Sequence, residues 1–244
     1  MTQGQAVRHI GAYMWKRERL GIFFTLLFAL YIASVISFSI NGVWAQDGEP
    51  FPRFFYIVID SMYLIMFPVF GLVMNKSAMG MWKGDSYSKR LAQWRVMPVP
   101  LKAIVQARFL QSAITLPIIG TLFLLLQYLL APNLREMVSP LQWVESGIIW
   151  GCYAFAINIV FAWCELGFDG KRYVQFYLGF MIFMTIVSIL LVWQGVFLFQ
   201  GVLEIIKEGH GVFLIIGLMI VAAIVTWMGF RATISRIRAR SMTL

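Results

Sequence analysis

Six stretches of about 20 or more mostly apolar residues alternate along the chain with short segments that hold most of its charged residues. Because a helix rises about 1.5 Å per residue, each stretch would be roughly 30 Å long, which matches the hydrocarbon core of a bilayer. The pattern predicts an all-α integral membrane protein, one domain over 1–244, with spans at Leu20–Ile40, Phe54–Met74, Ile104–Leu130, Leu141–Trp163, Tyr173–Phe199 and Gly211–Phe230.

The basic residues between these stretches fall almost entirely on one side of the predicted membrane. If the connections alternate between two sides, only Arg53, Arg135 and Lys207 of the 20 Lys and Arg residues lie apart from the rest. Basic residues concentrate in the cytoplasmic connections of membrane proteins. We therefore expect a multi-pass protein of the cell membrane, with both termini and the connection 75–103 in the cytoplasm.

The composition excludes an ordinary soluble or disordered protein. The chain is 60% hydrophobic and 13% charged, whereas soluble proteins contain about 25% charged residues. Its net charge of +9 does not call for a nucleic-acid partner, because basic residues at the ends of spans contact anionic lipid headgroups. The lipid bilayer is the first predicted partner.

The segment Gln5–Arg19, ahead of the first span, has the pattern of an amphipathic helix. Val7, Ile10 and Met14 fall on one stripe, and charged residues occupy the opposite side. A basic face beside an apolar stripe is typical of a helix that lies in the plane of the membrane surface. The alternative is a plain basic leader.

The connection 75–103 contains the strongest candidate for a functional element. Asp85 is a good helix N-cap, and Pro98 would end the helix that follows. Such a helix has an apolar face and a basic face, made respectively by Tyr87, Leu91 and Trp94 and by Lys89, Arg90 and Arg95. It either only lies at the membrane surface or serves as a docking element for a cytoplasmic partner, for which aromatic and arginine side chains are well suited.

On the opposite side, the segment 194–210 is apolar but interrupted by glycines. It is either a short helix that re-enters the outer leaflet or the continuation of a long, tilted fifth span.

Two polar residues lie inside predicted spans. Asp60 is about 9 Å into the second span, where a carboxylate would contact substrate, pair with Arg53 or meet a neighbouring span. Asn158, in the fourth span, is expected to form hydrogen bonds between helices.

The sequence contains none of the common catalytic or metal-binding motifs. It has no Walker A motif, no H-E-x-x-H, no G-x-S-x-G and no C-x-x-C. His9 and His210 fall on opposite sides of the predicted membrane and could not share a metal ion. We therefore expect no catalysis, no metal and no cofactor in this chain, so that energy for any transport would come from another subunit.

This layout resembles the permease subunit of ABC exporters of the type-2 family. Members have an in-plane N-terminal helix, six spans, a cytoplasmic coupling helix between spans two and three, and re-entrant helices between spans five and six. Here 5–19, Asp85–Arg95 and 194–210 fall at those places. The family's loop pattern is similar to the run Asp85, Lys89-Arg90-Leu91, Met97-Pro98, Ile104-Val105 and Ala107-Arg108.

The resemblance implies a bacterial inner-membrane exporter that works in efflux as a dimer, with a second copy or a related permease. Separate cytoplasmic ATPase subunits would bind ATP and Mg²⁺ and dock on the coupling helix. The alternatives are a non-transporting sensor, immunity or assembly protein, and an intramembrane enzyme that uses Asp60 with a second polar residue.

The predicted topology is tested by labelling single introduced cysteines from outside the cell. Reagent should reach cysteines placed at Asp47 or Glu136, in the outer connections 41–53 and 131–141, or within 200–210. It should not reach cysteines placed at Lys83 or Arg240. Labelling at position 83 in intact cells would contradict both the topology and the coupling interpretation.

Overall fold

The computed structural model describes residues 2–44, 52–73, 86–96 and 99–240, and within these ranges the chain is helical and has no strand. Five of its helices are long and apolar enough to cross a membrane. They are α1 (Gln3–Val43), α6 (Leu101–Leu130), α8 (Pro140–Gly167), α9 (Gly170–Trp193) and α11 (Gly211–Ala239). These helices confirm the all-α fold and fit a multi-pass membrane protein, whereas six spans and their orientation stay predictions.

The second predicted span corresponds to a shorter helix, α2 (Arg53–Val69). Its 17 residues would rise about 26 Å, and residues 70–73 after it are not helical. The expected end at Met74 is therefore too late. Pro68 has no N–H group to continue the hydrogen-bond pattern, and the helix ends one residue beyond it.

Three short helices lie between the long ones, namely α5 (Ser86–Val96), α7 (Pro132–Met137) and α10 (Leu198–Lys207). The sequence predicted a helix at α5 and offered one at α10 as an alternative, but it did not predict α7. The expectation that the fifth span continues to Phe199 is wrong, because α9 ends at Trp193 and the chain turns at Gly195, whose φ is 81°. A positive φ is readily adopted by glycine.

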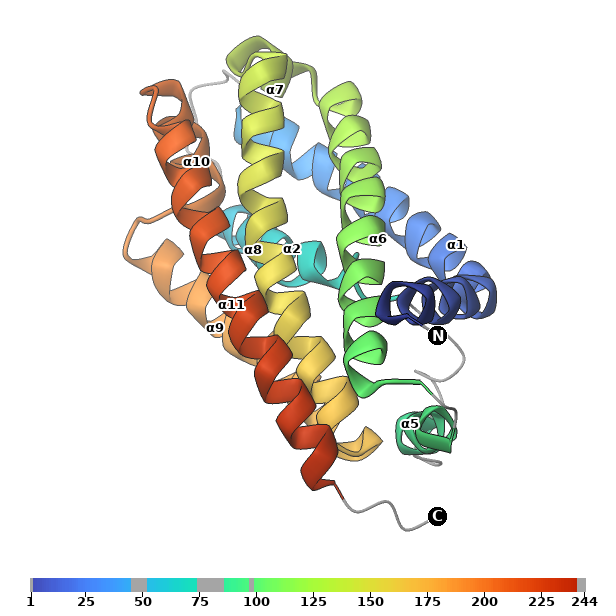
Figure 1. Ribbon diagram of the computed structural model, residues 1–244. Helices are drawn as coiled ribbons and strands as arrows, with labels where there is room; N and C mark the ends of the chain where they lie inside the picture. The colour runs from blue at the N-terminus through green and yellow to red at the C-terminus, as the bar shows by residue number, and fades with distance from the viewer. Residues whose placement is uncertain (1, 45–51, 74–85, 97–98, 241–244) are drawn as a thin grey trace.

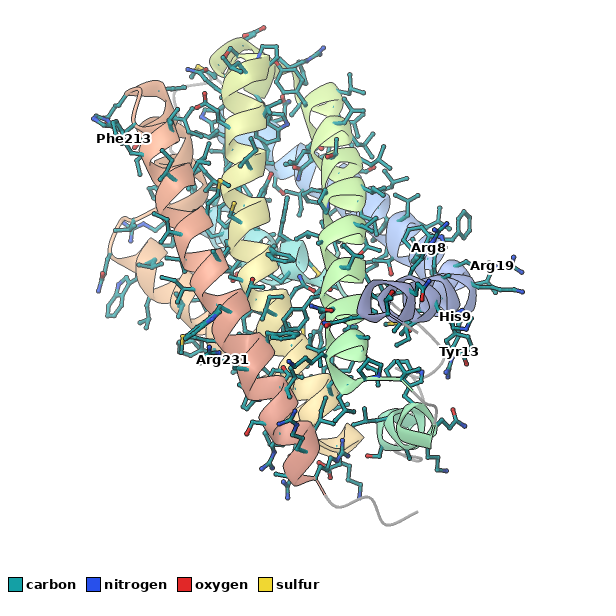
Figure 2. The ribbon with its side chains drawn as sticks, in the orientation of Figure 1. Arg8, His9, Tyr13, Arg19, Phe213 and Arg231 are labelled. Atoms are coloured by element: carbon teal, nitrogen blue, oxygen red, sulfur yellow. The ribbon has the colours of Figure 1, made fainter. Side chains whose placement is uncertain are left out.

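Helix α1 joins the predicted in-plane segment to the first span without a break over 41 residues. Figure 1 shows its first turns, in dark blue, at an angle to the remainder, which passes behind α6. Figure 2 shows Arg8, His9, Tyr13 and Arg19 pointing away from the bundle. Whether this segment lies in the plane of a membrane stays a prediction.

The apolar stripe of that segment packs on the protein itself. Ala6, Ile10 and Met14 are buried at intervals of four residues, and Val7 is half-buried. These side chains contact residues of α5 and α6, so protein rather than lipid covers the stripe that the sequence assigned to the membrane surface.

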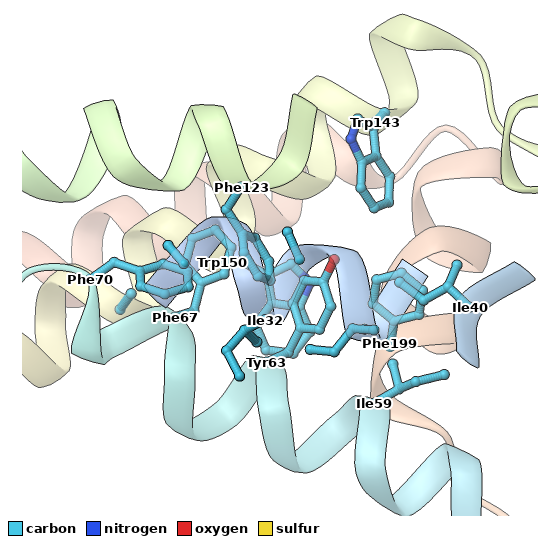
Figure 3. Packing of buried hydrophobic residues seen from close by; sticks show 14 of the residues in the cluster. Ile32, Ile40, Ile59, Tyr63, Phe67, Phe70, Phe123, Trp143, Trp150 and Phe199 are labelled. Carbon is cyan, nitrogen blue, oxygen red and sulfur yellow. The ribbon is translucent and has the colours of Figure 1, made fainter. Parts of the chain in front are cut away.

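Helix α8 stands between α6 and α11, with α7 at one end of the bundle and α5 and the last turns of α11 at the other (Figure 1). The aromatic core lies around the fully buried ring of Tyr63 (Figure 3). Four rings lie within 4.6–6.1 Å of it, centre to centre: Phe67, Phe123, Trp150 and Phe199. This cluster joins α2, α6, α8 and α10.

Candidate functional site

The predicted coupling helix, α5, buries its apolar face inside the chain. Leu91 is 1% exposed and Trp94 is 4% exposed, while Lys89 and Gln93 are exposed. The apolar face belongs to what we call the basal cluster, which draws on α1, α5, α6, α8 and α11 and comprises Ala6, Ile10, Met14, Leu91, Trp94, Ala103, Ile104, Val105, Ala107, Phe109, Ile159, Ala162, Leu166, Ile234 and Ile237.

This placement changes how the predicted docking residues would act. Leu91 and Trp94 were expected to contact a partner, but they contact the chain's own helices, so a partner would meet the side that carries Lys89. Asp85 and Pro98 lie outside the described residues, as do the side chains of Tyr87, Arg90 and Arg95. Docking on α5 therefore stays a prediction.

Helix α5 is also tied to the end of α11. Arg240, the residue that follows α11, donates a hydrogen bond from its guanidinium to the hydroxyl of Ser88. Since α5 contacts α8 and α9 as well, it rests against the ends of several long helices.

A buried ion pair connects α6 to α8 above the basal cluster. Arg108 Nε lies 2.8 Å from Glu165 Oε2, and both side chains are 5% exposed. Arg108 also donates to Ser112 Oγ at 2.8 Å, and Ser112 donates to the carbonyl of Gly71 at 3.2 Å. The sequence placed Arg108 with the basic residues of the cytoplasmic side, in the first turn of the third span; the structure buries it because its charge and donors find partners inside the bundle.

A second buried contact connects α1 to α6, about one helical turn after Arg108 on α6. Gln111 donates from its amide to the carboxylate of Glu18, and both residues are buried. Sequence reasoning overlooked Glu18, although it follows Ala6, Ile10 and Met14 at the same four-residue interval. A carboxylate on the buried stripe of an amphipathic helix indicates an internal partner.

Asp60 caps the short helix α10. The backbone N–H groups of Leu198 and Phe199 donate to its two carboxylate oxygens at 3.0 and 2.9 Å. Asp60 is 1% exposed, whereas Arg53, its expected partner, is exposed. The first N–H groups of a helix have no partner within the helix and carry a partial positive charge, so a carboxylate is the group that best satisfies them.

Aromatic contacts on both sides hold α10 against Asp60. The ring of Tyr56 lies 4.3 Å from that of Phe197, and Tyr63 lies 4.6 Å from Phe199, centre to centre. Tyr63 uses its hydroxyl elsewhere, donating to Gln127 Oε1 at 2.6 Å. Asp60 is thus part of the joint between α2 and α10, rather than a carboxylate facing an open path.

Asn158 connects α8 to the end of α2. Its Nδ2 donates to the carbonyls of Pro68 and Ala154, each at 2.8 Å. A Cβ at Gly71, two residues after α2, would lie 2.5 Å from the Asn158 amide, so the chain passes close to α8 here and a larger residue would force that amide to move. The polar residue that the sequence placed between helices is found there.

Removing the charge of Asp60 should destabilise the protein. Asp60→Asn presents an amide N–H to one of the two α10 donors, and we expect it to lower the free energy of unfolding by roughly 1 to 3 kcal/mol. Denaturant unfolding in detergent measures this. Asp169→Asn is the matched control, because Asp169 precedes α9 but accepts no capping bond, and it should cost under about 0.5 kcal/mol. Equal stability of the Asp60 variant and wild type would refute the cap.

The ion pair between Arg108 and Glu165 should show strong coupling in a double-mutant cycle. Arg108→Met leaves Glu165 buried without its counter-charge and should cost about 3 to 5 kcal/mol, whereas Arg108→Met with Glu165→Met should recover much of that loss. Unfolding measured on the single and double variants tests this. Additive losses would mean that the pair is not formed.

Comparison of the chain with models of protein families, with curated proteins and with solved structures finds no match. The resemblance to type-2 ABC permeases thus rests on the residues and layout described above.

Proposed function

We propose that this chain is the permease subunit of an ABC exporter of the type-2 family. In this proposal two permeases, identical or related, form the transport path in the cell membrane. Separate cytoplasmic subunits bind ATP and Mg²⁺ and act on the permeases through α5. This chain itself performs no catalysis and holds no cofactor.

The observation that carries the proposal is the packing of α5 against the bundle. One side of this helix is buried in the basal cluster, whose other members lie on α1, α6, α8 and α11, and the other side carries the exposed Lys89 and Gln93. A helix packed in this way is suited to transmit a displacement from its exposed side directly to the long helices. Its place at the same end of the bundle as the last turns of α11 (Figure 1) fits a common, cytoplasmic side for both.

The contacts between α1, α6 and α8 offer a route by which such a displacement reaches the rest of the bundle. Met14 in the basal cluster and Glu18 one turn later both belong to the unbroken helix α1. The Glu18–Gln111 contact and the Arg108–Glu165 pair then join α1, α6 and α8. Interfaces with discrete partners of this kind support rigid-body tilting between two states.

One observation favours the alternative of a non-transporting sensor, immunity or assembly protein. The apolar residues Leu91 and Trp94 are already buried within the chain, and the exposed side chains that the structure describes on α5, Lys89 and Gln93, are polar. The intramembrane-enzyme alternative loses its main support, because both oxygens of Asp60 accept backbone hydrogen bonds.

A charge reversal on the exposed side of α5 distinguishes these functions. The full chain, purified gently from its native membrane, should carry Mg²⁺-dependent ATP hydrolysis. Lys89→Glu should lower this activity at least fivefold, because it repels an acidic docking surface. Lys207→Glu, at the exposed end of α10, should leave the activity within twofold of wild type.

The outcome that would contradict the proposal is a well-folded, single-species preparation without associated ATP hydrolysis. Leu91→Asp is unsuitable for this test, since it would place a charge in the basal cluster and unfold the region whether or not a partner docks there.

A further inference from the structure

A wide groove runs along the face of the bundle formed by α6, α8 and α11. Its volume is about 1300 Å³. Helices α6 and α11 each pack on α8 and contact one another much less, and Figure 1 shows them on the two sides of α8. The groove therefore has α8 as its floor and the other two helices as its walls.

Small residues keep this groove open. Gly147 and Gly151 lie on the floor, Gly120 lies on one wall, and Ala222 and Ala223 lie on the other. A Cβ built on Gly151 would meet no atom within 4 Å. A Cβ on Gly147 would instead lie 2.6 Å from Leu124 Cδ1, so the open part of the floor is at Gly151.

The length and chemistry of the groove suit an acyl chain. Its lining follows α6 from Gln106 to Tyr128, a rise of about 33 Å that is close to the hydrocarbon thickness of a bilayer. None of the lining residues that the structure describes is charged. An occupant must therefore be long and apolar over most of its length.

A cation lies beside one wall of the groove. The rings of Phe109 and Phe230 line the same part of the groove, with centres 6.3 Å apart. Trp227 also lines it, and the guanidinium of Arg231 lies 4.1 Å from the Trp227 ring centre. Arg231 is exposed on α11 (Figure 2). Tryptophan and arginine side by side are typical of the depth at which lipid headgroups lie.

We propose that this groove binds one membrane lipid with an anionic headgroup, its acyl chains lying over Gly147 and Gly151 and its headgroup at Arg231. The proposal rests on the apolar bundle and not on transport. A helix of a second copy would also pack on small residues, but the exposed apolar helices α6, α9 and α11 contain no acidic residue. Charge complementarity at Arg231 therefore favours the lipid.

Filling the groove should displace the lipid. The full chain is purified in mild detergent with added phosphatidylglycerol, and native mass spectrometry measures the fraction that retains one lipid. Gly151→Leu should lower this fraction at least fivefold. The matched control is Gly179→Leu on α9, which has equally open surroundings outside the groove and should stay within twofold of wild type. Ala113→Leu, on the groove wall, serves if the first variant does not fold.

Removing the cation should alter which lipid binds. Arg231→Gln should reduce the preference for phosphatidylglycerol over phosphatidylcholine at least threefold, while Arg172→Gln, an exposed arginine outside the groove, should not. The proposal is overturned if both groove-filling variants retain lipid like wild type, if lipid choice ignores Arg231, or if filling the groove separates dimers without loss of lipid.

Discussion

A peptide group surrounded by hydrocarbon must find its hydrogen-bond partner within the protein, and in this chain that constraint falls on the ends of α2 and α10. Asp60 takes the first N–H groups of α10. Pro68 deprives the Leu64 carbonyl of its helical donor, and the hydroxyl of Tyr153 donates to that carbonyl at 2.8 Å. Asn158 takes the carbonyl of Pro68 itself. Two of these three side chains come from α8, which explains why that helix occupies the centre of the bundle.

Helix α8 consequently has two unlike faces. Toward α2 it presents Tyr153 and Asn158, whose hydrogen bonds fix the position of the neighbouring helix. Toward the groove it presents Gly147, which lies close to Leu124, and Gly151, which leaves space. The bundle is cross-linked by polar contacts on one side and open to an apolar ligand on the other. If α5 transmits movement as proposed, the helices α2, α8 and α10 would therefore move together.

The sequence predicted the elements of this fold far better than their contacts. Apolar runs locate helices because a helix that crosses a bilayer needs about 20 apolar residues, and breaks at Gly195 and Pro68 account for the misplaced ends. The partners of Asp60 could not be predicted, because they are backbone N–H groups, which nearly every residue type has. The face of α5 that carries Leu91 and Trp94 was correctly recognised as apolar, but amphipathicity does not say what covers these two side chains. Among these contacts, only that of Glu18 could have been found from the sequence, because Glu18 follows Met14 at the four-residue interval of the buried stripe.

The cap on α10 also has a bearing on how the protein is made. Asp60 and Leu198 are 138 residues apart, and at about 5 to 20 residues per second the second is synthesised roughly 7 to 28 s after the first. Throughout that interval the carboxylate exists before its partner. A chain that ends before α10 would keep Asp60 in its second apolar segment without these two backbone donors, so this single contact distinguishes chains that include α10 from chains that end before it.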